Sequence, residues 1–185
     1  MSLKSNETKK RSELPVLRVA LIEDAEAITR LVNSAYRGES SKAGWTTEAD
    51  LLGGQRTDSE KIHEMMGEPG SVLLVGGLDG IQFCVSLIRK PEKRTYLGML
   101  TVLPTLQDRG WGAQLLARAE EWARENWQTK IMEMTVITKR TELIEWYLRR
   151  GYSRTDRSEA FPYGDSRFGE PRVNDLEFIV LEKVL

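Results

Sequence analysis

The chain has 185 residues, and its 27 lysines and arginines nearly balance its 28 aspartates and glutamates, which gives a formal charge of −1 at pH 7. This length suffices for one domain with its own core, and the balanced charge excludes the basic surface that binds nucleic acid or anionic membranes, so we expect neither partner. The single cysteine, Cys84, excludes an internal disulfide and a multi-cysteine zinc site, and no metal is expected.

Residues 1–14 are polar, charged and aperiodic, which predicts a flexible leader ahead of a single domain over residues 15–185. The chain shows no signal peptide or long apolar run, which is typical of a cytoplasmic protein. Residues 15–21 predict a first strand. A helix should begin after Asp24, which can cap it, and end at Gly38, because apolar residues between them follow helical spacing: Ile28, Leu31, Val32, Ala35 and Tyr36.

Residues 39–70 predict a long, irregular connection, a kind of segment that often contributes to function. Within it, Thr57 and Glu60 have the spacing of a capping box in front of a short amphipathic helix. From residue 71 the pattern changes to strands. A hairpin is predicted by two apolar runs around the turn Asp79-Gly80, and a third strand follows; the three runs are 71–78, 81–90 and 95–102.

Cys84 lies in the apolar second strand of this hairpin, which favours a place in the core over a nucleophilic role. Beyond the hairpin, the periodicity predicts a helix from Gly110 to Trp127 that packs on the sheet. The rest of the chain is predicted as a strand, a short helix, a long loop and a last strand, over residues 130–138, 141–151, 153–173 and 175–185.

Gly110 and Gly112 lie where the long helix is expected to begin. Glycine within a helix costs about 1 kcal/mol relative to alanine, so the pair indicates that bare backbone is needed there. The first amides of a helix have no internal partner and favour a phosphate. A dinucleotide-binding motif would need a third glycine where Leu115 stands, and the Gly-Lys-Ser/Thr of triphosphate-binding loops is absent.

At these residues the sequence resembles the GCN5-related N-acetyltransferase (GNAT) family. The family signature Q/R-x-x-G-x-G/A matches residues 107–112 (QDRGWG), and its later Tyr-x-x-x-Gly-Phe/Tyr matches Tyr147 to Tyr152. Both signatures occur in the family's order, and the resemblance in element order covers residues 16–185. It implies an α/β fold, the acyl-CoA N-acyltransferase fold, in which helices flank a mixed, mostly antiparallel central sheet.

The resemblance implies acetyl-coenzyme A (acetyl-CoA) as the cofactor. In the family, the loop and helix start clasp the pyrophosphate, and the backbone of the preceding strand holds the pantetheine arm. The matching residues are Gln107, Asp108, Arg109, Gly110, Trp111, Gly112 and Ala113 for the loop, and Leu100, Thr101 and Val102 for the strand. The sequence departs from the family at Arg140, seven residues before Tyr147, where many members have an asparagine.

Transfer of an acetyl group from a thioester to an amine needs a polarised carbonyl, a neutral amine and a proton for the departing thiolate. Tyr147 is the candidate acid, since a phenol with a pKa of about 10 stays protonated where a thiol, at about 8.5, ionises. The alternative is a packing aromatic beside Trp146. Glu133, an acid within an apolar strand, is the candidate base, directly or through water; the alternatives are exposure or pairing with an arginine.

The resemblance places the acceptor pocket near the first long loop, with Tyr36, Trp45 and Glu48 as candidates and Phe161 of the C-terminal loop closing it. Glu48 could attract an ammonium and Trp45 could cover it, or both could be loop packing. Together these features predict an N-acetyltransferase that moves the acetyl group of acetyl-CoA to a small-molecule amine by direct attack in a ternary complex.

Two alternatives stay open at this point: a regulatory module that binds acetyl-CoA without turnover, and an enzyme that acetylates a protein or peptide. A homodimer also stays open as the oligomeric state.

Overall fold

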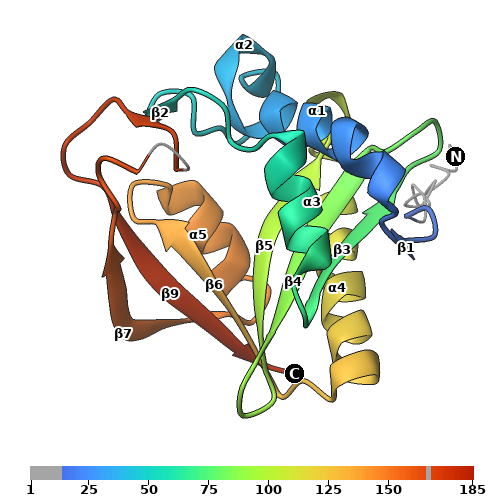
Figure 1. Ribbon diagram of the computed structural model, residues 1–185. Coiled ribbons are helices and arrows are strands. Elements are labelled where there is room, and N and C mark those ends of the chain that lie inside the picture. The colour runs from blue at the N-terminus through green and yellow to red at the C-terminus, as the bar shows by residue number, and fades with distance from the viewer. Residues whose placement is uncertain (1–13, 166–167) are drawn as a thin grey trace, which may run out of the picture.

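The computed structural model describes residues 14–165 and 168–185. Its main sheet has seven strands in the order β1-β3-β4-β5-β6-β9-β7, and β2 pairs separately with β8 (Figure 1). The strands are β1 (Arg18–Val19), β2 (Leu52–Gly53), β3 (Ser71–Gly76), β4 (Phe83–Lys90), β5 (Arg94–Val102), β6 (Ile131–Ile137), β7 (Ser153–Ala160), β8 (Glu170–Pro171) and β9 (Glu177–Val184). The helices are α1 (Ala25–Tyr36), α2 (Gly38–Ser41), α3 (Ser59–Gly67), α4 (Trp111–Trp127) and α5 (Thr141–Leu148), with 3-10 turns η1 (Ile22–Asp24) and η2 (Pro104–Leu106).

Strands β5 and β6 form the one parallel pair that the described residues contain, and the other ladders are antiparallel. This confirms the predicted mixed, mostly antiparallel sheet. The parallel ladder covers only three residue pairs and ends at Tyr96 and Glu133, although β5 continues to Val102 and β6 to Ile137. Because the strands separate beyond Tyr96, the edge of β5 that faces β6 lacks a strand partner at the centre of the sheet.

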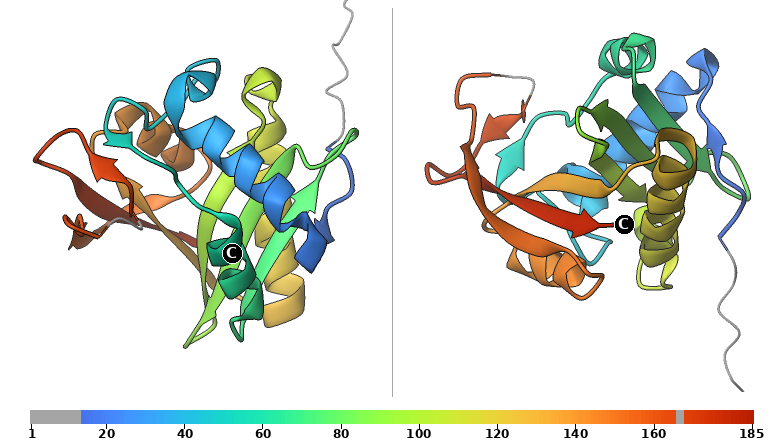
Figure 2. Two further views of the ribbon diagram at one scale, coloured as in Figure 1. Left: turned by 45° about the horizontal axis from the view of Figure 1, so that its top comes forward. Right: turned by 90° about the horizontal axis from the view of Figure 1, so that it is seen from below.

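Helices cover both faces of the sheet, with α1 and α3 on one side and α4 and α5 on the other (Figures 1 and 2). The central strands are therefore buried on both faces. In β3, Leu74 packs in the core that contains α4 and α5, whereas Leu73 packs in the core that contains α1 and α3, because successive side chains alternate across a strand. Cys84 belongs to the latter core and is fully buried, which confirms its predicted place, and burial raises the pKa of its thiol to about 12.

Residues 153–173 do not form one long loop, and that prediction is wrong. β7 occupies the edge of the sheet and pairs with β9, and β8 pairs with β2. β7 is polar and mostly exposed, so it lacks the apolar alternation by which a strand is recognised. The β2–β8 ladder ties the C-terminal segment to the connection of residues 39–70.

Both N-terminal capping predictions are wrong. The helix α3 is capped by Asp58, which accepts from the Lys61 amide at 2.8 Å, one residue later than the predicted Thr57–Glu60 pair. Asp24 precedes α1 without capping it, since its carboxylate accepts from the Leu21 amide at 2.7 Å and pairs with Arg18 at 2.6 Å. Gly38, at φ +68°, follows the end of α1 as predicted.

The N-terminal segment is integrated into the fold from Leu14 onward. Leu14 is buried, and its amide donates to Gln114 Oε1 at 2.9 Å. The rest of the predicted leader lies outside the described residues. The first strand is shorter than the predicted 15–21, because the chain turns into η1 after Val19 and Ala20. In the described part of the chain, no helix combines the length and apolar character that crossing a membrane requires.

Candidate active site

Two clefts meet where β5 and β6 separate. The first, of about 380 Å³, lies between the end of β5, the start of α4 and the helix α5. The second, of about 410 Å³, lies beyond the opening, under the segments that the β2–β8 ladder joins. The residues that line both are Tyr36, Leu100, Arg140, Leu143 and Tyr147. These five therefore mark the passage from one cleft to the other.

The start of α4 contributes backbone to the first cleft. Gly110 is the N-cap residue at φ +81°, and Asp108 is also left-handed, at φ +61°. The following amides point out of the helix end and have no intrahelical acceptor. A Cβ atom added at Gly112 would lie 3.5 Å from the Trp146 side chain, so this side chain is close to the backbone of Gly112. Bare amides beside a narrow cleft fit a pyrophosphate group.

Gln107 links two parts of this cleft. Its Oε1 accepts from the Trp45 amide at 3.1 Å, and its Nε2 donates to the Val102 carbonyl at 3.1 Å. The loop before Trp45 is thereby fixed to the end of β5. Trp45 lines the first cleft near Trp146, with ring centroids 6.3 Å apart, and it is not among the residues that line the second. The structure thus sets Trp45 beside the predicted cofactor residues.

The predicted cofactor residues divide into two groups. Leu100, Thr101, Val102, Gln107, Asp108, Gly110, Gly112 and Ala113 line the first cleft. Arg109 is exposed and Trp111 is buried against Phe83, with ring centroids 4.8 Å apart, and neither is among its lining residues. The Trp111 ring therefore packs in the core and does not line the first cleft.

Sequence reasoning missed Arg149 and Arg150, which line the first cleft. Arg150 lies 3.5 Å above the centroid of the Trp146 ring and donates to the Trp146 carbonyl at 2.7 Å. Burial is the main cause that lowers the pKa of its guanidinium. The sequence did contain a signal for these two arginines, since both lie inside the Tyr-x-x-x-Gly-Tyr motif. Their charge suits the phosphates of a nucleotide-containing ligand.

Leu100 lies at the passage, on the part of β5 that β6 leaves unpaired. Its carbonyl accepts from the Tyr36 hydroxyl at 3.1 Å. The neighbouring Met99 has a positive φ of 47°, and the β4–β5 register shifts at this point. This bulge re-aims the peptide groups of β5, as bulges commonly do next to active sites. Residues 100–102 line the first cleft along the edge of β5 that β6 leaves unpaired, so a ligand that threads the opening would run along this edge.

Tyr147 is 5 % exposed and lines both clefts. Its ring packs edge-on against Trp146 and Tyr152, which fixes its position on α5. Burial is the main cause that raises the pKa of its hydroxyl far above the ordinary value. The hydroxyl therefore stays protonated at neutral pH and is able to donate a hydrogen bond.

Glu133 lies on β6 at the end of the parallel ladder and lines the second cleft. Arg94 donates to Glu133 Oε2 at 2.8 Å and Arg157 at 3.1 Å, and both arginines also pair with Glu182. Burial acts to raise the pKa of Glu133, but the two arginines together outweigh it and lower the pKa. A carboxylate with a lowered pKa is a weak base, so this environment does not favour the predicted base role.

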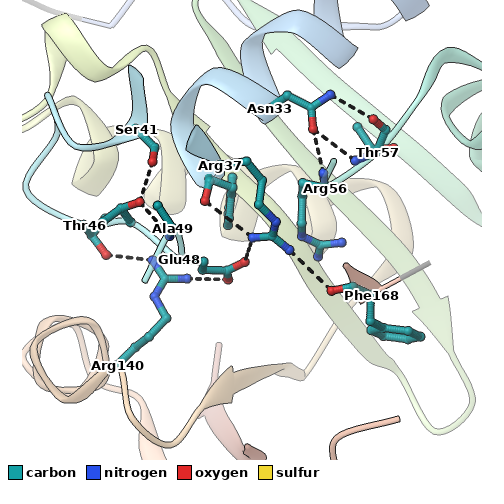
Figure 3. Close-up of polar contacts among 12 residues, drawn as sticks. Asn33, Arg37, Ser41, Thr46, Glu48, Ala49, Arg56, Thr57, Arg140 and Phe168 are labelled. Atoms are coloured by element: carbon teal, nitrogen blue, oxygen red, sulfur yellow. Dashed lines mark hydrogen bonds and ion pairs between the residues drawn. The ribbon is translucent and has the colours of Figure 1, made fainter. Parts of the chain in front are cut away.

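Glu48 is buried at the centre of a charge cluster that we name the arginine cluster: Arg37, Glu48, Arg56 and Arg140 (Figure 3). Arg37 Nη1 donates to Glu48 Oε2, and Arg140 Nη1 donates to Oε1 at 2.8 Å. Burial acts to raise the pKa of Glu48, and the surrounding arginines outweigh it and lower the pKa. Both oxygens already accept from guanidinium groups, and the positive charge of these groups opposes the binding of an ammonium ion there.

Arg140 stands where the sequence departs from the family pattern, and in the structure it pairs with Glu48. It also donates to Thr46 Oγ1 at 2.7 Å and so ties the turn before α5 to the first long loop. Phe161 is buried and lines the second cleft, next to Phe168 and Phe178. Tyr36 lines both clefts. Of the four predicted acceptor residues, the structure brings Tyr36, Glu48 and Phe161 together and places Trp45 apart from them.

We expect Glu48→Gln to destabilise the protein, because it leaves two buried guanidinium groups without a counter-charge. Removing one partner of a buried ion pair typically costs about 3–5 kcal/mol of unfolding free energy. Urea denaturation at pH 7 measures this loss. The control is Glu39→Gln, whose ion pair with Lys42 is on the surface, where solvent screens it, so its loss should change the stability far less. If Glu48→Gln and Glu39→Gln lower the unfolding free energy by the same small amount, the argument from burial is wrong.

The site has the layout of an enzyme that takes an acyl group from coenzyme A. Bare amides at the start of α4 suit the pyrophosphate, the unpaired edge of β5 suits the pantetheine arm, and the passage leads to a second cleft for an acceptor. The sequence profile of the Acetyltransferase (GNAT) family matches residues 43–152, more than half of the chain. The chain belongs to this family, and it is an acetyltransferase that uses acetyl-CoA.

Solved structures share this fold at low sequence identity. The ribosomal-protein-alanine N-acetyltransferase from Brucella melitensis has a TM-score of 0.67 at 18% identity, over 92% of this chain and 99% of that one. A mutant of the spermidine N-acetyltransferase from Vibrio cholerae has a TM-score of 0.63 at 12% identity, over 91% and 94%. A GNAT family acetyltransferase from Elizabethkingia anophelis with acetyl-CoA bound has a TM-score of 0.57 at 20% identity, over 68% and 82%. No curated protein matches the chain.

Proposed function

We propose that the protein is an N-acetyltransferase whose acceptor is a small-molecule amine. The observation that supports this most directly is the cover over the second cleft. The β2–β8 ladder joins the first long loop to the C-terminal segment, and Leu52, Phe161 and Phe168 line the cleft beneath it. Its volume of about 410 Å³ is in the range of small-molecule sites. An extended peptide would need an open groove instead of a covered cleft. Such a groove would have favoured the alternative of a protein substrate.

In the proposed reaction, the thioester supplies the acetyl group and the amine attacks its carbonyl carbon from the second cleft. The residues of the chain hold both partners at the passage. The amides at the start of α4 bind phosphate, and the free edge of β5 around Leu100 orients the chain that leads to the thioester. Tyr147 donates a hydrogen bond to the sulfur as charge develops there. Its raised pKa means that it stabilises the thiolate without giving up its proton completely.

The amine must be neutral when it attacks, and among the described residues that line the second cleft none near the passage is a carboxylate of ordinary basicity. Glu48 and Glu133 are both held by arginines with lowered pKa values. We therefore propose that the amine loses its proton to water before attack. Glu133 has a structural role instead, because its ion pairs with Arg94 and Arg157 join β6 to β5 and β7.

This proposal predicts a rising pH profile. With a saturating level of acetyl-CoA, kcat/KM for an amine should increase about tenfold per pH unit below the pKa of that amine, because only the neutral fraction reacts. Glu133→Gln should lower kcat by less than about tenfold, whereas loss of a true general base costs about 100- to 10,000-fold. A flat profile between pH 6.5 and 8.5, combined with a large loss in Glu133→Gln, would restore Glu133 as the base.

The proposed function is tested by release of free coenzyme A, measured with a thiol reagent across small amines and short peptides. We expect turnover with small amines at kcat/KM values well above those of any peptide. A preference for peptides would support the alternative that the protein acetylates a polypeptide.

A further inference from the structure

The second cleft contains more buried positive charge than its own acids balance. Arg37, which directly follows α1, and Arg140, in the turn before α5, contact the Glu48 carboxylate, and Arg56 lies near them in the connection before α3 (Figure 3). Arg37 and Arg140 pair with Glu48, but Arg56 has no ion pair with any residue in the ranges 14–165 and 168–185, although it lowers the pKa of Glu48 through its charge. Two guanidinium groups therefore share the Glu48 carboxylate, and the charge of the third, Arg56, is left without an ion-pair partner among the described residues.

The other charged residues of the cleft do not remove this excess. Glu133 is occupied by Arg94 and Arg157 at the far end of the cleft. Lys90 and Glu159 also line the cleft, but both are exposed at its rim and have opposite charges. The arginine cluster thus keeps a net positive charge inside a partly enclosed space, where water screens it less than at the surface.

The arginine cluster also has unused hydrogen-bond donors. Arg37 is 5 % exposed, and within the described residues its Nε has no hydrogen-bond partner; the same holds for the buried Nε of Arg140. The Arg56 side chain touches the Tyr36 ring, with its guanidinium carbon 5.7 Å from the centroid, and is only half-buried. Arg56 is therefore the accessible guanidinium group of the arginine cluster, and its donors are free for a ligand with acceptor oxygens.

We propose that the acceptor carries an anionic group, a carboxylate or a phosphorus oxyacid, a few bonds from the amine that is acetylated. This inference rests on the proposed small-molecule function and names the substrate class for that site. Arg56 binds the anionic group, and the Arg37–Glu48–Arg140 pairs hold the surrounding backbone in place. A cationic polyamine is disfavoured, because its second ammonium would meet the same arginines.

The geometry suits an acceptor of this kind. Arg56 and Arg140 both lie against the Tyr36 ring, at 5.7 and 5.8 Å from its centroid, and the Tyr36 hydroxyl donates to the Leu100 carbonyl at the passage. A single tyrosine side chain therefore separates the anion site from the point of transfer. An amino acid, or an aminoalkyl phosphonate, spans such a distance between its amine and its acidic group.

The test compares acceptor pairs that differ only in the anionic group: α-amino acids against their carboxamides, and 2-aminoethylphosphonate against propylamine. Rates are corrected for the fraction of neutral amine. We expect kcat/KM to favour the anionic member at least tenfold, on the order of one charge-assisted hydrogen bond. In Arg56→Gln, the ratio of kcat/KM between the anionic and the neutral member of each pair should fall to about one, mainly through a change in KM. Arg56→Lys should keep part of this preference. The control, Arg30→Gln on the exposed face of α1, removes the same charge and should keep the preference unchanged.

The outcomes separate this inference from the proposed function. Equal turnover of neutral and anionic amines, or an equal loss for both in Arg56→Gln, overturns the inference and leaves the small-molecule function intact. If peptides are the only acceptors that are acetylated, both the inference and the proposed small-molecule function are overturned. If no acceptor of the panel reacts, binding of methylphosphonate is measured by thermal shift with coenzyme A saturating the first cleft. Stabilisation of the parent but not of Arg56→Gln supports the anion site, and no stabilisation of either overturns it.

Discussion

A Gly110→Val enzyme is expected to bind acetyl-CoA about 100-fold more weakly, or worse. Gly110 has φ +81°, which a β-branched residue rarely adopts, and it forms the N-cap of the helix whose amides face the first cleft. Valine would shift this turn and block the close approach of a phosphate. Two charge-assisted hydrogen bonds, worth about 1.5–3 kcal/mol each, account for a loss of this size. Isothermal titration calorimetry with coenzyme A measures it directly.

The matched control is Gly112→Ala, two residues further along the same turn. Here an added Cβ meets Trp146 at 3.5 Å and Val102 at 3.9 Å, which are ordinary contact distances. We expect affinity within about threefold of the parent, since alanine suits a helix. Thermal unfolding without ligand reports whether Gly110→Val is still folded. A folded Gly110→Val protein with parental affinity would remove the start of α4 from the cofactor site.

The start of α4 was predictable because its chemistry is local. Glycine at a positive φ and free amides at a helix end depend on neighbouring residues alone, so a short stretch of sequence is sufficient to indicate them. The strands β3 and β4 were predictable for a similar reason, since burial on both faces produces long apolar runs. In β5 and β6 buried residues alternate with partly buried ones, which is also a local strand signal. β7 escaped detection because its stability comes from pairing with β9 rather than from its own side chains.

The arginine cluster was not predictable, because its members come from three separate segments. Glu48 and Arg140 are 92 residues apart in the chain, and no local pattern relates them. The sequence suggests a free carboxylate at Glu48 that attracts an ammonium, whereas the fold surrounds it with guanidinium groups and reverses the expected charge of the cleft. The environment of Glu133 was not predictable for the same reason, since its partners Arg94 and Arg157 lie on two other strands.

Tyr147→Phe is expected to lower kcat by about 100-fold or more, while the affinity for coenzyme A stays within about threefold of the parent. The substitution keeps the ring that packs against Trp146 and Tyr152 and deletes only the hydroxyl at the passage. Because burial raises the pKa of this hydroxyl, it remains a donor throughout pH 6–9, and the loss of rate should not vary with pH in this range. Steady-state rates and calorimetry separate the two effects.

The control for this prediction is Tyr152→Phe, which also deletes one buried hydroxyl from the same aromatic group. The Tyr152 hydroxyl donates to Glu120 at 2.9 Å and Tyr152 is not among the residues that line either cleft, so its loss should reduce stability and leave kcat within about threefold of the parent. If the two variants lose activity equally, the effect of Tyr147 comes from packing. A Tyr147→Phe enzyme with parental kcat at saturating acceptor would show that the departing thiolate needs no donor from α5, and protonation would then fall to water that enters between β5 and β6.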